Sequence, residues 1–211
     1  HAFAVIEGFF NPAENNMLEL PQEYRKKVSK MDLESLHIFL KSLHDYAFVY
    51  KDYFSEKDAI LRYDDFVGRI LNICNVLEVS TFYPYLLQQL YARRTDIISE
   101  YELKTRFFAV EKYVILNAIC RGSTKNYNNE CRQLVDGRKK PQEIFEENSY
   151  ISENNFVNGI RRLTTNKLPT LLLFWIDLYK RYLLNVDVKS LRYEYTLEHI
   201  MPQKWEQKWF D

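Results

Sequence analysis

The scarcity of glycine and proline is the feature that most limits what this chain can fold into. Only 5 glycines and 6 prolines occur among 211 residues, although 46% of the residues are apolar. Sandwiches and barrels reverse direction at many tight turns, which need these residue types. Long segments of regular apolar spacing favour helices instead. We therefore expect a mainly α fold, an irregular multi-helix bundle with a short β-strand segment near the C-terminus.

Charge and cysteine content exclude several functional classes. The 29 basic and 29 acidic residues cancel, so any contact with DNA has to come from a local patch rather than from an overall field. Cys74, Cys120 and Cys131 are widely spaced, which argues against a disulfide framework and against a zinc site. No apolar run reaches the roughly 18 residues of a membrane span. We expect a cytoplasmic protein with reduced thiols and no membrane partner.

Apolar residues recur at intervals of three and four along most of the chain, which predicts a series of helices. Ser99 and Glu102 have the spacing of a capping box and mark the start of one helix, and Gly122 marks its end. Pro169 opens the most apolar helix, which we expect at the centre of the bundle. The predicted helices cover residues 33–50, 59–77, 81–94, 100–121, 126–135, 153–160 and 169–183.

The pattern changes after Asn185. Apolar residues then alternate with polar ones, which is the two-residue period of a strand. We therefore predict a helical domain over residues 1–186 and the truncated start of a second domain over residues 187–211. The alternating residues are Val186, Val188, Leu191, Tyr193, Tyr195 and Leu197.

An acidic residue and a histidine stand side by side directly after this predicted strand. Hydrolysis of a phosphodiester needs a general base for water and a divalent cation held by hard oxygen ligands. His199 suits the base because its unperturbed pKa is about 6.5, and Glu198 suits a ligand of Mg²⁺. Adjacent side chains of a regular strand point to opposite faces, and Pro202 supplies a bend that relaxes this limit. The full string is Glu198-His199-Ile200-Met201-Pro202-Gln203.

A bare Glu-His pair also has a plainer interpretation, with Glu198 solvated and His199 half-buried. Six consecutive positions resemble the opening of an HNH nuclease site, however, and they follow a predicted strand as that pattern requires. The resemblance implies that Glu198 binds a divalent metal and that His199 activates the attacking water. It gives Pro202 and Gln203 a structural part at the end of the strand.

Over about residues 101–209 the chain resembles the GmrSD family of modification-dependent restriction endonucleases. The string at residues 198–203, with Trp205 close behind, carries most of this likeness, and residues 118–122 carry a weaker part. In that family a C-terminal HNH domain follows a helical region. The resemblance implies a parent protein that cuts DNA with Mg²⁺ or a similar ion. It also implies an N-terminal nucleotide-hydrolysing domain in the same chain.

Two parts of the family pattern are missing from these residues. No Asp-Gly-Gln-Gln-Arg motif occurs, and only nine residues follow Pro202, too few for the Asn and His residues that complete the metal site. We therefore expect a fragment with two cut ends that is inactive alone and binds no cofactor. Its helical part would serve as a scaffold between the other two domains. The alternative is a non-catalytic helical module that binds protein or nucleic acid.

Other candidate residues have weaker patterns. Arg138, Lys139 and Lys140 form a basic turn that we carry as a possible DNA contact, although short basic turns are usually solvated surface. His37 and His44 lie seven residues apart, whereas a metal pair on one helix prefers four, and we expect no site there. The tyrosines have helical spacing, which favours packing over the stacking of bases.

Overall fold

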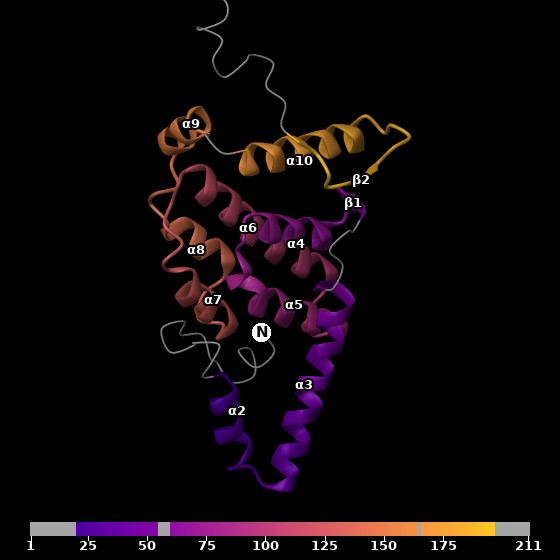
Figure 1. Cartoon of the computed structure of the whole chain (residues 1–211), viewed down its shortest axis with the longest axis vertical. Coiled ribbons are helices and arrows are strands. Elements are labelled where there is room, and N and C mark those ends of the chain that lie inside the picture. The colour runs from indigo at the N-terminus through magenta and orange to yellow at the C-terminus, as the bar shows by residue number, and fades with distance from the viewer. Residues whose placement is uncertain (1–19, 55–59, 164–165, 197–211) are drawn as a thin grey trace, which may run out of the picture.

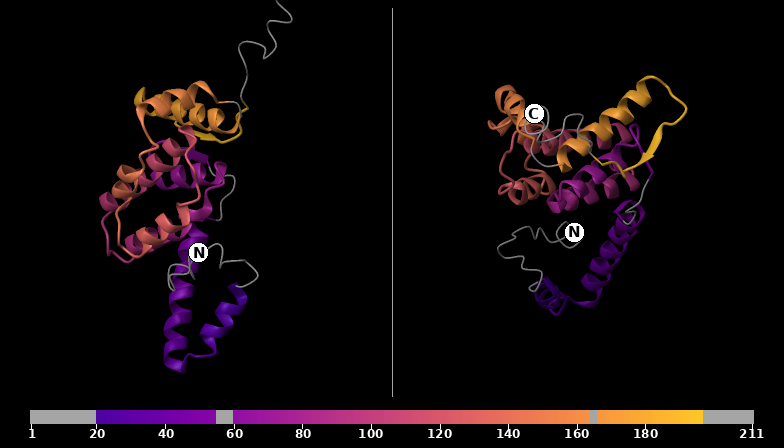
Figure 2. Two further views of the ribbon diagram at one scale, coloured as in Figure 1. Left: turned by 90° about the vertical axis from the view of Figure 1, so that its left-hand side faces the viewer. Right: turned by 45° about the horizontal axis from the view of Figure 1, so that its top comes forward.

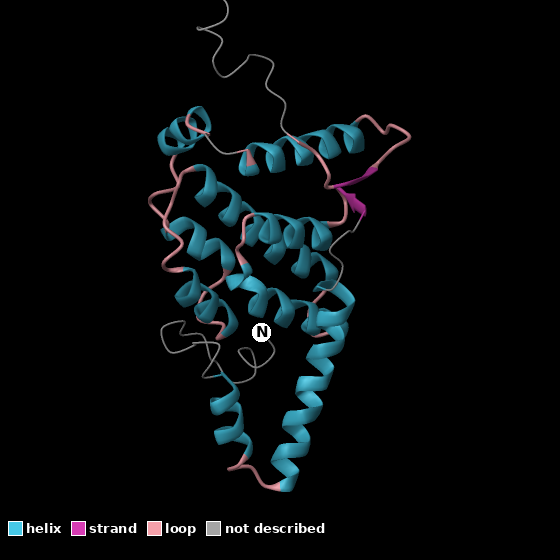
Figure 3. Cartoon of the chain, in the orientation of Figure 1, coloured by secondary structure: helices cyan, strands magenta, loops and turns pink. Residues whose placement is uncertain are grey.

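The computed structural model describes residues 20–54, 60–163 and 166–196, and within these ranges it is mainly helical with one small sheet (Figures 1 and 3). The predicted fold class is confirmed, including the short strand near the C-terminus. None of the described helices is both long and apolar enough to cross a membrane.

The elements are, in chain order, α2 (Leu20–Val28), α3 (Leu33–Phe54), β1 (Ile60–Arg62), α4 (Phe66–Val76), a 3-10 turn (Ser80–Phe82), α5 (Tyr83–Arg94), α6 (Glu100–Ile119), α7 (Tyr127–Val135), α8 (Pro141–Glu147), α9 (Glu153–Arg161), α10 (Lys167–Leu183) and β2 (Ser190–Arg192).

Helix α6 organises the core, because it contacts α4, α5, α8 and α9. It begins at the predicted capping box. The Ser99 hydroxyl oxygen accepts a hydrogen bond of 3.2 Å from the Glu102 N–H, and the Glu102 carboxylate accepts one of 2.8 Å from the Ser99 N–H. Phe107, Val110 and Val114 then fall on its buried side. Tyr113 and Asn117 are buried on another side, so α6 is a central helix with four other helices around it.

The predicted helix over residues 59–77 is wrong in its first part. Residues 60–62 form β1, and α4 begins only at Phe66. Asp65 ends the strand conformation and caps the helix, since its Oδ1 accepts a hydrogen bond of 2.9 Å from the Gly68 N–H. A Cβ atom at Gly68 would lie 2.3 Å from Asp65 Oδ2. Gly68 is therefore the residue that leaves room for this cap.

Strand β1 pairs with β2 in antiparallel register, with Leu61 opposite Leu191. The pairing joins the C-terminal strand to the N-terminal half of the helical body (Figure 1). The ring of Tyr193 then packs 5.0 Å from that of Phe174 on α10, and the ring of Tyr195 packs 5.6 Å from it. The chain therefore runs along α10 as it leaves the sheet.

Helix α10 does not lie at the centre of the bundle. Leu171, Phe174 and Leu178 are buried, but Leu173 is 55% exposed and Ile176 is 47% exposed. The helix lies across one end of the body, next to α4 (Figure 1). The prediction was wrong because apolar residues around most of a helix do not require burial on every side. Within the described chain, α10 has neighbours on one side.

Helices α2 and α3 extend away from the rest of the protein (Figure 2). The C-terminal half of α3 packs on α5, where the ring centroids of Tyr46 and Tyr91 are 4.5 Å apart. Near the other end of α3, Phe39 packs 6.0 Å from Tyr24 of α2. Several apolar side chains of α3 remain at the surface, among them Ile38 and Phe48.

Candidate functional site

The four residues of the predicted nuclease motif, Glu198, His199, Pro202 and Gln203, lie outside the described residues. The last part of the chain before them is placed by Tyr195, which lies against Phe174. The motif thus begins three residues after Tyr195, whose side chain packs on α10. Their assigned roles stay predictions.

The predicted basic turn lies between α7 and α8, and its charges are largely neutralised by neighbouring carboxylates. Arg138 Nη2 is 2.9 Å from Asp136 Oδ2, and Lys139 forms an ion pair with Glu147. A phosphate would have to compete with these carboxylates for both side chains. DNA contact at Arg138, Lys139 and Lys140 also stays a prediction.

A polar pocket of about 600 Å³ opens beside this turn, between α6, α7 and α8. We call it the amide-lined pocket, because four of its side chains are primary amides. Lys139 from the basic turn and Arg121 from the end of α6 also line it. Its volume is in the range of small-ligand sites. The pocket is defined by Asn126, Asn129, Glu130, Gln133, Asn148 and Tyr150.

The floor of the amide-lined pocket is a hydrogen-bonded network that reaches into the core. The Tyr113 hydroxyl is 2.9 Å from each carboxylate oxygen of Glu130 and accepts a hydrogen bond of 3.2 Å from Asn148 Nδ2. Asn117 Nδ2 donates to the Tyr127 hydroxyl at 2.7 Å. Tyr113 and Asn117 are only 2% and 1% exposed, so this floor is rigidly packed.

Glu130 is the charged side chain of this network, and it accepts few hydrogen bonds. Burial raises the pKa of its carboxyl, while the hydrogen bond from Tyr113 and the charge of Lys139 lower it and the charge of Glu147 raises it. A carboxylate has about four acceptor sites. Within the described chain its only hydrogen-bond donor is the single O–H of Tyr113. Glu130 therefore keeps acceptor capacity on the pocket side.

A polar spacing in the sequence indicates this pocket, although it is not one of the motifs described above. Asn126, Asn129, Glu130 and Gln133 are spaced i, i+3, i+4 and i+7, which places them on one side of α7. The buried side of the same helix is formed by Tyr127, Cys131 and Leu134, which do not belong to this stripe. This stripe contains no lysine or arginine, unlike the salt-bridged face of mixed charge that is typical of a solvent-exposed helix.

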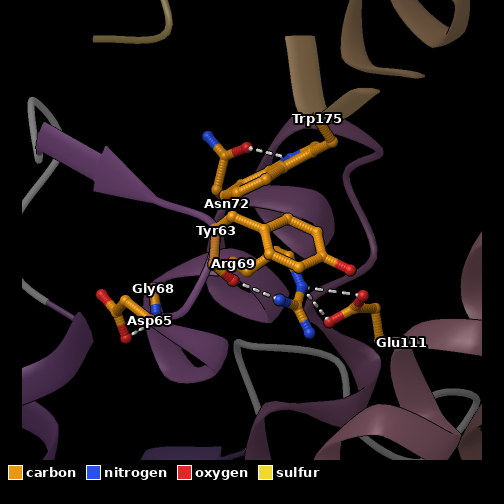
Figure 4. A network of polar contacts seen from close by, with 7 residues as sticks. All are labelled: Tyr63, Asp65, Gly68, Arg69, Asn72, Glu111 and Trp175. Atoms are coloured by element: carbon orange, nitrogen blue, oxygen red, sulfur yellow. Dashed lines mark hydrogen bonds and ion pairs between the residues drawn. The ribbon is translucent and has the colours of Figure 1, made fainter. Parts of the chain in front are cut away.

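A second polar cluster lies on the other side of α6, and its charged side chains, Arg69 and Glu111, are buried (Figure 4). Arg69 Nε is 2.9 and 2.8 Å from the two carboxylate oxygens of Glu111, and Nη1 donates to the Tyr63 carbonyl oxygen. The guanidinium also lies 4.9 Å from the centre of the Tyr63 ring. Nearby, Trp175 Nε1 donates to Asn72 Oδ1 at 3.2 Å. The cluster joins β1, α4, α6 and α10 and is best explained as a structural contact.

The described residues contain neither a cluster of metal ligands nor an exposed cysteine. No group of three or more His, Cys, Asp or Glu side chains within them is arranged to hold a metal ion. The three cysteines are free and buried. Burial raises the pKa of Cys74 and that of Cys131 to about 12, so both thiols are protonated at neutral pH and poorly nucleophilic.

Comparison with known proteins leaves the family open. No protein-family model, no curated protein and no solved structure matches this chain.

Proposed function

We propose that this chain is the helical region of a metal-dependent HNH DNA endonuclease of a cytoplasmic phage-defence restriction system, similar to the GmrSD family, and that it carries the first strand of the nuclease domain. The string at residues 198–203 is the observation that carries the proposal. In the intact protein His199 is the general base and Glu198 a ligand of Mg²⁺ or a similar ion. DNA is the substrate.

The helical body has a mechanical part in this proposal. A nuclease strand must enter its site from a fixed point, since a small displacement of a catalytic group lowers the rate strongly. The pairing of β2 with β1 and the packing of Tyr195 on Phe174 support such an anchor. We propose that this body braces the nuclease against a nucleotide-hydrolysing domain of the same chain.

The test uses the full-length protein that contains this chain, with modified and unmodified DNA, Mg²⁺ and nucleoside triphosphates. His199→Ala is expected to lower the cleavage rate by about 10²–10⁴-fold, the usual contribution of a general base. His44→Ala is the matched control, because His44 is an exposed histidine of α3 outside the motif. A variant at His199 that cuts as fast as the wild type contradicts the assignment of the base.

The 211-residue chain alone gives a second test of the same proposal. We expect it to cut no DNA under these conditions, because the family pattern places further metal-site residues beyond the string. Cleavage by the purified chain that EDTA abolishes would show that the site is complete within these residues.

A non-catalytic interaction module is the second candidate, and the apolar surface of α3 favours it. Ile38 is 60% exposed and Phe48 is 45% exposed on the helix that extends from the body. Exposed apolar patches often mark surfaces that bind another protein. Under this alternative His199→Ala has no effect on any DNA-cleavage activity, and Phe48→Ser abolishes binding of the partner instead.

A further inference from the structure

The amide-lined pocket gathers hydrogen-bonding groups that the described part of the chain leaves unused. The side chains of Asn129 and Gln133 line the pocket and have no hydrogen-bond partner within the described residues, and the side chain of Asn126 caps no helix. Each primary amide offers two donors and one acceptor. Glu130 adds an acceptor whose only donor in that region is Tyr113. The pocket thus presents donors and acceptors together on one wall.

We propose that the amide-lined pocket binds a nucleobase. The edge of a nucleobase alternates N–H donors with oxygen and ring-nitrogen acceptors, and Asn or Gln side chains pair with such an edge through two hydrogen bonds. A carboxylate such as Glu130 accepts from an exocyclic amino group. Tyr150 lines the same pocket and is 49% exposed, so its ring has a free surface on which a base can stack.

The charges around the pocket favour a neutral ligand over a simple anion or cation. Two basic and two acidic side chains line the pocket, so their charges cancel. Lys139 is paired with Glu147, and the charge of Arg121, which donates to the carbonyl oxygen of Arg162, is balanced by that of Glu130. Burial raises the pKa of the Glu130 carboxyl, which lowers the cost of sharing a proton with a ring nitrogen. A planar, neutral ligand rich in amide-like groups fits these features, and it requires no change in the existing ion pair.

A nucleobase can come from two sources, and the pocket chemistry is the same for both. It can be the base of a free nucleoside or nucleotide, or a base that has left the stack of a nucleic acid. The proposal is independent of the nuclease assignment, since it uses no residue of the 198–203 string.

The experiment follows the side-chain NH₂ and backbone amide signals of the ¹⁵N-labelled protein by NMR. Adenosine, guanosine, cytidine and thymidine are added separately, with glucose as a polar ligand that lacks a base. A DNA duplex with one bulged base is compared with the same duplex carrying an abasic site at the bulge. We expect at least one base-containing ligand to shift the signals of Asn126, Asn129 and Gln133, and we expect these shifts to saturate as the ligand concentration rises.

Variants then locate the site. Glu130→Gln is expected to weaken binding by roughly tenfold to a hundredfold, because its half-buried carboxylate makes a charge-assisted hydrogen bond. Asn129→Ala is expected to weaken binding by roughly threefold to tenfold, because its amide makes a neutral one. Glu146→Gln and Asn128→Ala are the matched controls, because neither residue lines the pocket. Asn129 is exposed, so its variant remains informative if Glu130→Gln unfolds the protein.

Each outcome decides the proposal. Nucleoside binding that Asn129→Ala weakens supports a free ligand, and binding of the bulged duplex but not of its abasic counterpart supports a base from nucleic acid. The proposal is overturned if no base-containing ligand shifts these signals, if the pocket variants bind like the controls, or if glucose binds at the pocket as well as any nucleoside.

Discussion

Two polar clusters on opposite sides of α6 begin only two residues apart, at Glu111 and Tyr113, and they are built in different ways. In the first, the Nε–H of Arg69 lies between the two carboxylate oxygens of Glu111, and these two side chains are 7% and 11% exposed. In the second, Tyr113 gives a single O–H to Glu130, whose carboxylate borders a pocket. The first cluster is closed and the second is open.

The difference shows where this protein uses buried charge for cohesion and where it has room for a ligand. Burial raises the pKa of the carboxyl in both Glu111 and Glu130, so both are desolvated. At Glu111 the charge and hydrogen bond of Arg69 oppose that rise in pKa, whereas at Glu130 the hydrogen bond from Tyr113 and the charge of Lys139 do so. A buried carboxylate paired with a full positive charge can only lose that partner, whereas a carboxylate that borders a pocket can gain one.

The largest effect is expected when the closed cluster loses its cation. Arg69→Ala leaves the buried carboxylate of Glu111 unpaired, and such a change costs about 3–5 kcal/mol of unfolding free energy. Urea denaturation followed by circular dichroism measures it. Arg62→Ala is the control, because Arg62 pairs with Asp64 at the surface and its loss should leave the midpoint almost unchanged. Equal losses in the two variants would contradict the distinction between closed and exposed pairs.

A smaller effect is expected from the hydroxyl at the floor of the open cluster. Tyr113→Phe removes the only described donor to Glu130 and an acceptor for Asn148, which should cost about 1–3 kcal/mol in the same denaturation experiment. Tyr85→Phe is the control. Tyr85 is 3% exposed against 2% for Tyr113, and its hydroxyl has no hydrogen-bond partner within the described chain. If Tyr85→Phe is the more costly change, the network does not stabilise the floor.

Sequence alone predicted most of the helices, because helix signals are local. The capping box at Ser99 occurs in the structure as predicted, and the predicted helix over residues 153–160 is present as α9. The error before Phe66 has a local cause as well, since Ile60 and Leu61 continue the apolar spacing of α4 although Asp65 starts the helix. Whether Ile60 and Leu61 form a strand depends on a partner about 130 residues away, Leu191 and its neighbours, which no local pattern contains.

The two polar clusters were missed for a related reason. Arg69, Glu111 and Tyr63 come from three separate elements, and nothing in the sequence shows that they meet. The stripe on α7 was visible as a spacing, but its meaning depends on Asn148 and Tyr150, which the loop after α8 brings to the other wall. The motif at residues 198–203 is the opposite case, since its interpretation depends on sequence alone.

The smallest effect distinguishes the two clusters by pH. A carboxyl whose pKa is raised by folding, like that of Glu130, stabilises the folded state below the pKa of the unfolded chain and loses this contribution as pH rises through the higher folded pKa. Its ordinary value is 4.5, so the loss begins near that pH. Glu130→Gln should therefore flatten the decline of stability above pH 4.5, as measured by urea denaturation at a series of pH values, whereas Glu146→Gln should keep the wild-type slope. Glu111→Gln should lower stability at neutral pH, where it leaves Arg69 buried without a counter-charge. A Glu130→Gln profile parallel to that of the wild type would mean that water reaches this carboxylate as freely as it does an exposed one, and the open cluster would then be ordinary surface.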